Sequence, residues 1–258
     1  MKIKPLKLTF FLIFIFTISA AIVKAEKSDY PFKPGEKLTF SLRWGIFYAG
    51  EAVLQVLPEE IVNKQNSLHF VLTTESCSFL DVFYKVRDRV DSYTDIDMTH
   101  SILYKKKINE GKTKRDVTVN FDWINKKAHY SNFNVCIKPI ELKPGSFDPL
   151  SVFYISRLMD FDDKKQIEIP VTDGKKCVLG VAEIIKREKV KLKIGTFDTY
   201  LIEPELKHVG GVFEKSKNAK IQLWVTADKY RIPVKIKSKV KVGSFTGELI
   251  SYESSSTL

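Results

Sequence analysis

The chain has 258 residues and a formal net charge of +11, with 44% hydrophobic and 28% charged residues. Three cysteines, an odd number, exclude more than one internal disulfide and leave at least one thiol over. After the first 25 residues no apolar run approaches the roughly 20 residues of a membrane-spanning helix, so the rest of the chain is expected to be soluble.

The N-terminus has the pattern of a secretory signal peptide. Three lysines among the first seven residues precede an apolar run at 8–23, and Val23-Lys24-Ala25 places small residues around a cleavage site. A retained membrane anchor is the alternative, but the run is shorter than a spanning helix and two hydroxyl side chains interrupt it. We therefore expect removal of residues 1–25.

The remaining chain, residues 26–258, is expected to form a single domain in the periplasm. Its 233 residues suffice to bury a substantial core. Its net charge is +7, because the signal peptide removes four lysines and no acidic residue.

A two-residue alternation of apolar and polar side chains dominates the first half of this domain. Leu38, Phe40 and Leu42 share one face of an extended segment, as expected for a half-buried strand. The same reasoning predicts strands at 38–44, 47–57, 68–74, 86–96, 102–108, 117–123 and 128–130. Residues 78–84 are the exception: they have helical spacing, and Ser78 and Asp81 resemble a capping box.

Asp148-Pro149 opens the clearest predicted helix, because Asp is a strong N-cap and Pro is favoured at the first helical position. This helix is expected at 150–161. After it, strands are predicted at 166–171, 177–186, 189–194, 197–203, 220–226, 232–242 and 245–252. Strands and helices do not alternate, so the fold class predicted is mainly β: a curled antiparallel sheet, a half-barrel or open barrel, with two short helices packed on it.

Several segments together resemble a known family of exported bacterial proteins, domain of unknown function 3108. The resemblance rests on Pro34–Phe40 followed by Ala49–Ala52, then on Tyr84–Arg89, Asp148–Ser151 and Trp224–Val234. It implies a periplasmic location and a mainly β fold, and it brings no established activity. Trp224–Val234 also resembles a segment of periplasmic lipoprotein carriers, whose curved sheet wraps an apolar cavity.

Seven lysines alternate with apolar residues on two predicted strands, which puts each set on one face of its strand. They equal the whole excess charge of the exported chain: Lys189, Lys191, Lys193, Lys235, Lys237, Lys239 and Lys241. One interpretation is a surface that contacts anionic lipid head groups or acidic cell-wall polymer. The other is a solvated outer face whose lysines protect exposed edges from aggregation.

The aromatic residues are numerous, and they allow two interpretations. They fill a core, or some of them line an apolar ligand cavity inside the curled sheet, with the two helices plugging or gating its mouth. The candidate ligand-contacting residues are Trp44, Phe79, Phe83, Trp123, Phe153 and Trp224.

No motif for catalysis, metal binding or a cofactor is present. The four histidines are scattered, there is no G-x-S-x-G elbow, and no cysteine pair has a metal-ligand spacing. Cys77, Cys136 and Cys177 are interpreted as small buried hydrophobic residues or as one disulfide with a thiol left over. Nucleic acid is a poor partner for an exported chain whose lysines lack interleaved aromatics.

The function predicted from the sequence is therefore non-enzymatic. The favoured hypothesis is a periplasmic carrier that binds an amphipathic, lipid-like molecule. The alternative is an envelope scaffold that docks on anionic polymer or a partner protein through a basic sheet face.

The signal-peptide prediction has a direct test. The protein isolated from its host is expected to begin at Glu26, as read by intact-mass measurement and N-terminal sequencing. Recovery of the full chain in the membrane fraction would contradict cleavage and support the anchor instead.

Overall fold

The fold comes from a computed structural model, which describes residues 29–162, 165–206, 219–240 and 243–254. The predicted signal peptide and Lys241 lie outside these ranges. No helix among the described residues is long and apolar enough to cross a membrane.

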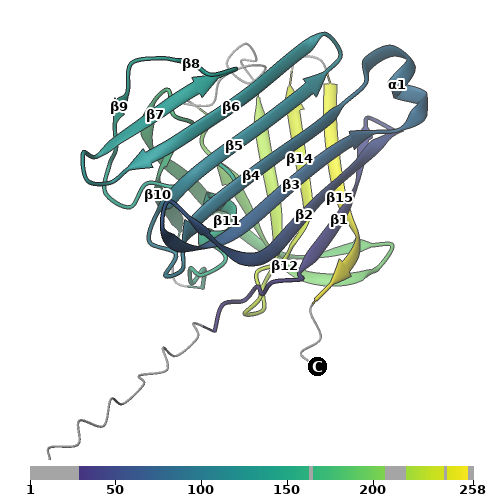
Figure 1. The fold of residues 1–258 in the computed structure, drawn as a ribbon. Helices are drawn as coiled ribbons and strands as arrows, with labels where there is room; N and C mark the ends of the chain where they lie inside the picture. The colour runs from purple at the N-terminus through teal and green to yellow at the C-terminus, as the bar shows by residue number, and fades with distance from the viewer. Residues whose placement is uncertain (1–28, 163–164, 207–218, 241–242, 255–258) are drawn as a thin grey trace, which may run out of the picture.

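One antiparallel sheet of 15 strands forms most of the molecule, and it curls without closing into a barrel (Figure 1). The predicted fold class is thus confirmed. The strands are β1 (Lys37–Trp44), β2 (Phe47–Val62), β3 (Gln65–Ser76), β4 (Arg87–Asp95), β5 (Ser101–Glu110), β6 (Thr113–Asp122), β7 (Lys127–Asn132), β8 (Val135–Cys136), β9 (Ile140–Glu141), β10 (Gln166–Thr172), β11 (Cys177–Leu192), β12 (Gly195–Pro204), β13 (Lys220–Thr226), β14 (Pro233–Val240) and β15 (Gly243–Glu253).

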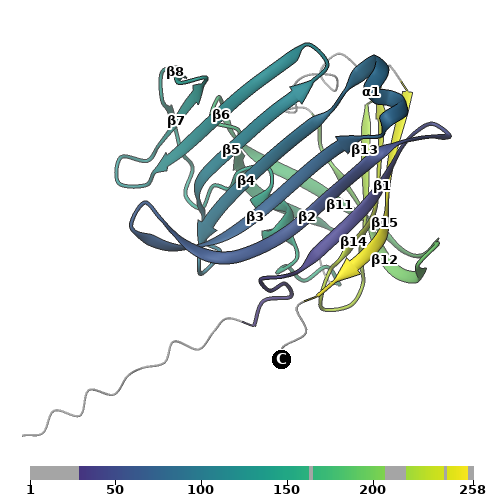
Figure 2. The same cartoon turned by 45° about the vertical axis from the view of Figure 1, so that its right-hand side comes forward.

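The sheet joins two runs of sequential strands. Spatial order is β10 to β15, then β1 to β8, with β9 paired to β7, so β15 beside β1 is the pairing that connects the two runs. In Figure 2 the two runs face each other across the interior. The strands that end the order do not pair with each other, but the segment before α2 (Ser151–Ser156) crosses the gap, where Phe147 bridges to Val171 in β10.

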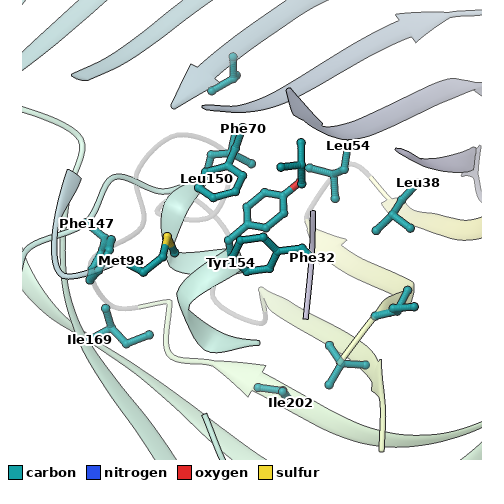
Figure 3. Close-up of a cluster of buried hydrophobic side chains, with 14 of the residues drawn as sticks. Phe32, Leu38, Leu54, Phe70, Met98, Phe147, Leu150, Tyr154, Ile169 and Ile202 are labelled. Carbon is teal, nitrogen blue, oxygen red and sulfur yellow. The ribbon is translucent and has the colours of Figure 1, made fainter. Parts of the chain in front are cut away.

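The alternating side chains of both runs meet around α2. Leu38, Phe40 and Leu54 are buried on the inner face, as the two-residue period requires. Tyr154 of α2 is 1% exposed and stacks on Phe70 of β3 with ring centroids 3.9 Å apart. Figure 3 shows these rings with Phe32 in the centre of the core.

A buried carboxylate anchors the beginning of α2. Asp148 accepts hydrogen bonds from the hydroxyls of Ser92 and Ser101, on β4 and β5, at 2.7 and 2.6 Å. It also accepts the Ser151 hydroxyl and the backbone N–H groups of Leu150 and Ser151. The predicted capping role of Asp148 is confirmed, and the same side chain attaches the helix to the sheet.

A buried ion pair holds the other end of α2. The Arg157 guanidinium binds both carboxylate oxygens of Glu36, at 2.6 and 3.0 Å, and both side chains are at most 3% exposed. The same guanidinium donates to the backbone carbonyls of Pro31 and Tyr230. Arg157 therefore connects the helix to the N-terminal segment and to the β13–β14 turn.

The predictions for the two helices need correction. The second helix covers six residues instead of 150–161, because the chain passes after Ser156 into tighter turns, in which Leu158 and Met159 bond three residues back. The first helix, α1 (Ser78–Tyr84), has the predicted bounds, but Ser78 does not cap it. Asp81 instead accepts from Ser76 and pairs with Arg87 at 2.6 Å.

Two strands predicted at 177–186 and 189–194 are one strand, β11, with an irregular register between Ile184 and Lys186. Charged residues there break the hydrophobic pattern without ending the hydrogen-bonded ladder. The short strands β8 and β9 were not predicted. The three cysteines form no disulfide, and none of them is buried as predicted: Cys136 is exposed, and Cys77 and Cys177 are partly exposed.

On the outer face of the sheet, the His69 ring lies between two carboxylates. Its nitrogens are 2.8 Å from Glu60 and 2.9 Å from Asp91, and Arg89 also binds Asp91 at 2.7 Å. Burial by itself raises the pKa of Asp91, but the hydrogen bonds with His69 and Arg89 lower it to about 2.

The first prediction from this fold concerns the buried ion pair. Arg157→Met should lower the free energy of unfolding by about 3–5 kcal/mol, because Glu36 is left charged and buried. The free energy of unfolding of the double variant Glu36→Leu/Arg157→Met should fall by less than the sum of the losses in the two single variants. Urea denaturation measures both. Additive losses would show that the two side chains act independently.

The second prediction concerns pH. The pKa of Asp91 is lowered from 3.8 to about 2 in the folded protein. Its stabilising contribution to the free energy of unfolding is therefore complete above pH 4 and disappears as the pH falls toward 2. The stability difference between the wild type and Asp91→Asn should therefore shrink by about 2 kcal/mol across this window. A difference that stays constant between pH 5 and pH 2 would contradict the assigned pKa.

Candidate functional site

An apolar chamber lies inside the curled sheet, on two sides of α2. Its first lobe, about 420 Å³, is bounded by the inner faces of β1 to β5, by α2 and by β13 and β14. Its second lobe, about 310 Å³, is bounded by β10 to β14 and the other side of the helix. Both lobes share Pro149, Phe153, Leu223 and Ile236, so they adjoin each other along α2.

The two lobes stay unfilled because several inward-facing positions carry small side chains. Ala52 on β2 lies between Phe40 and Thr74 in the register of the sheet, and it faces the first lobe. Gly180 and Ala182 on β11 face the second. Across the interior, Leu223 and Ile236 are direct register partners and form one wall. The strand alternation directs these side chains inward, and their small size keeps the interior from filling.

A third cavity, about 310 Å³, adjoins the first lobe and has a different chemistry. We call it the basic pocket, because four cationic side chains line it against the single carboxylate of Asp173: Lys106, Arg115, Lys175 and Lys176. It shares Tyr104, Lys106 and Pro149 with the first lobe. Glu110 on the same hairpin lies outside this lining, but it is near enough for the charges of Lys106 and Arg115 to favour its ionised form.

Two tyrosines complete the basic pocket. The Lys175 ammonium lies 4.8 Å from the centre of the Tyr130 ring, which orients it over an aromatic face. Burial, with the charges of Asp148 and Asp173, raises the pKa of Tyr104 well above its ordinary value. The Tyr104 hydroxyl is therefore neutral at physiological pH and remains a hydrogen-bond donor.

Of the six aromatic residues predicted to contact a ligand, Phe153 lines both lobes of the chamber. The other five lie outside the linings described above. Trp123 donates its ring N–H to the Ser101 carbonyl at 2.8 Å, and Trp224 donates to Glu188 at 2.9 Å. Trp44, Phe79 and Phe83 are exposed at one end of the molecule.

The predicted lysine rows do not form one surface. The described members are partly or fully exposed, and Lys235 pairs with Glu248 at 2.7 Å. In the register of the sheet, Lys191 is paired with Thr196 at the beginning of β12. Lys239 is level with Lys220, whose side chain pairs with Glu203 at the end of β12. The two rows thus occupy opposite ends of that strand.

The sequence reasoning missed the basic pocket. Its cations come from the β5–β6 hairpin and from the β10–β11 turn, which are more than 50 residues apart in the chain. The run Lys105-Lys106-Lys107 was a signal for the first group, since the middle lysine of three in a strand points to the opposite face from its neighbours. Nothing in the sequence indicated that Lys175 and Lys176 lie beside it.

Comparisons with known proteins concern family and fold. A family model described as "Protein of unknown function (DUF3108)" matches residues 39–250. No curated protein matches the sequence significantly.

Among solved structures, the chain is similar to a beta-barrel-like protein of domain of unknown function DUF1849 from Brucella abortus. The TM-score is 0.56 at 11% identity, and the match covers 88% of this chain and 100% of the other. At this identity the likeness shows the fold alone.

Two further matches have TM-scores below 0.5, and no argument rests on them. A candidate lipoprotein from Parabacteroides distasonis has a TM-score of 0.35 at 12% identity, covering 87% of this chain and 97% of that one. A candidate exported protein with a YmcC-like fold from Bacteroides fragilis has 0.36 at 10% identity, covering 87% and 98%.

Proposed function

The chain belongs to the DUF3108 family of proteins of unknown function, and from that premise we propose that it is a non-enzymatic periplasmic carrier of an anionic, lipid-like molecule. The apolar chamber takes the hydrocarbon part of the ligand, and the basic pocket takes its acidic head group. The single observation that carries this proposal is that the two cavities adjoin each other, with Tyr104 and Lys106 lining both.

The size and chemistry of the chamber suit such a ligand. Each lobe lies within the roughly 300–1,000 Å³ of typical ligand sites, and side chains such as Leu72, Val90 and Phe153 form apolar walls. Binding in the chamber removes the hydrocarbon part of the ligand from water, which favours binding by about 0.8 kcal/mol for each buried methylene group. The lobes on the two sides of α2 have room for two chains or for one bent chain.

The head group is proposed to bind where the cations meet. A carboxylate or phosphate in the basic pocket would accept charge-assisted hydrogen bonds from Lys106, Arg115, Lys175 or Lys176, and a further one from the neutral Tyr104 hydroxyl. An uncharged head group would lose these bonds. The pocket therefore favours acidic lipids over neutral lipids of the same length.

The alternative of an envelope scaffold has weaker support. It requires a continuous basic face, whereas the lysine rows of β11 and β14 lie at opposite ends of β12. The periplasmic location in the proposal rests on the signal-peptide pattern at residues 1–25.

The proposal is tested first on the protein as isolated. Native mass spectrometry of protein purified from its own host is expected to show a co-purifying acidic lipid. After removal of lipid, a dansyl-labelled undecanoic acid should bind with a blue shift of its fluorescence. Absence of both signals would disprove the carrier.

Substitutions then locate the ligand. Lys175→Ala/Lys176→Ala should weaken binding of the labelled acid at least tenfold, because a lost hydrogen bond between charged groups is worth about 1.5–3 kcal/mol net of its replacement by water. Binding of the corresponding labelled alcohol should change less than twofold. Ala182→Phe should weaken both probes, because its ring occupies the second lobe.

Lys189→Ala is the matched control, since Lys189 is an exposed lysine on β11 away from the basic pocket. It should bind both probes like the wild type. Equal losses for acid and alcohol in the double lysine variant would contradict the assigned head-group position.

A further inference from the structure

Exposed apolar side chains gather at one end of the sheet. We call this group the aromatic tip; it consists of the β1–β2 turn and the outer side of α1, and its members are 46–81% exposed: Trp44, Ile46, Phe47, Tyr48, Phe79, Val82, Phe83 and Tyr84. Figures 1 and 2 both place α1 beside this turn. The Cys77 N–H before α1 bonds to the carbonyl of Ala49 at 2.9 Å, which joins the two segments.

The aromatic tip is not part of the buried core. No residue of α1 is buried, and the helix is held by polar contacts, chiefly Asp81 with Arg87 at 2.6 Å and Ser76. Phe79 and Phe83 contact each other at 5.8 Å between ring centroids while both stay more than two-thirds exposed. Exposed apolar patches of this kind mark surfaces that bind a partner or a membrane.

A group of positive charges lies beside the aromatic tip. The β5–β6 hairpin carries six cations against Glu110 between residues 105 and 115: Lys105, Lys106, Lys107, Lys112, Lys114 and Arg115. Its turn contacts α1, because the Gly111 N–H bonds to the Lys85 carbonyl at 2.8 Å and a Cβ at Gly111 would meet the Tyr84 ring. On the other side of the β1–β2 turn, Phe245 stacks on Trp44 and extends the row of exposed rings.

This combination fits the interface of an anionic bilayer. Trp and Tyr favour the head-group region, Phe and Ile reach the acyl chains, and each Lys near an anionic surface adds to the attraction. The lysines of the β5–β6 hairpin lie beside the α1 part of the apolar group.

The chamber reaches the same end of the molecule. Leu42, which lines the first lobe, is two residues from Trp44 of the tip, and Thr74, which also lines it, is four residues before the start of α1. Lys106, which belongs to the basic hairpin, lines both the first lobe and the basic pocket. A lipid that leaves the chamber at this end would enter the surface on which the tip rests.

We propose that the aromatic tip and the β5–β6 hairpin dock the protein on an anionic lipid bilayer and present the first lobe of the chamber to it. This inference rests on the proposed carrier function, because docking on a bilayer would give the chamber access to its lipid ligand. It is testable separately, because docking uses side chains outside the chamber.

The experiment measures co-sedimentation with vesicles of phosphatidylcholine containing 30% phosphatidylglycerol, at low and high salt. The wild type should bind, and 0.5 M NaCl should release most of it, because salt screens the lysines. Phe47→Ser/Phe83→Ser should lower the partition coefficient at least tenfold. Lys112→Glu/Lys114→Glu should do the same at low salt.

Ile61→Ser/Ile124→Ser is the matched control, since both residues are exposed apolar side chains beside turns at the other end of their strands. It should bind vesicles like the wild type. Circular dichroism and melting curves should be unchanged in the Phe47/Phe83 variant, because neither residue is buried. Equal vesicle binding by this variant and the wild type, or no binding by the wild type, would overturn the inference.

The dansyl probe separates this failure from that of the carrier. The Phe47/Phe83 variant should bind the soluble labelled acid normally yet lose transfer of a fluorescent lipid between vesicles. If vesicle binding depends on the tip but the protein binds no probe, the docking surface is supported and the carrier function is disproved. Normal probe binding, together with vesicle binding that does not depend on the tip, would support the carrier and disprove the docking surface.

Discussion

The attachment of α2 at both ends is the constraint on which the rest of the structure depends. Asp148 ties the start of the helix to hydroxyls on β4 and β5, and Arg157 ties its end to Glu36 and to two backbone carbonyls. A six-residue helix is too short to be stable alone, and a buried charge without its partners is costly. The two polar clusters therefore fix the helix at one depth inside the sheet, where it divides the interior into lobes.

Side-chain size then decides which parts of the interior are solid and which are hollow. Near Tyr154, the rings of Phe32 and Phe70 fill the space, and they make the core that stabilises the fold. On the other sides of the helix, Ala52 and Ala182 occupy positions where larger residues would close the lobes. One sheet thus provides both a packed core and a chamber, because every strand directs alternate residues inward regardless of their volume.

A local excess of positive charge lies beside the chamber. Lys106 and Arg115 of the β5–β6 hairpin line the basic pocket, and their neighbours on the same hairpin adjoin the exposed rings of α1. In the proposed function, the same local excess of cations serves two purposes: it attracts an acidic bilayer, and it retains an acidic head group after the lipid has left that bilayer.

The sequence by itself determined the class of fold and most strand positions, because the period of apolar side chains is a local property that survives in any β-sheet arrangement. It also predicted α1, Asp148 as a helix cap, and Phe153 as a candidate cavity residue. Only the tertiary structure decided which aromatics face the chamber: Trp224 and Phe153 are both large aromatic residues, but the ring N–H of Trp224 bonds to Glu188 whereas Phe153 lines both lobes. The pairing of Arg157 with Glu36, and the meeting of Lys175 with Lys106, follow from how the sheet curls, since contacts between distant segments leave no periodic trace in the chain.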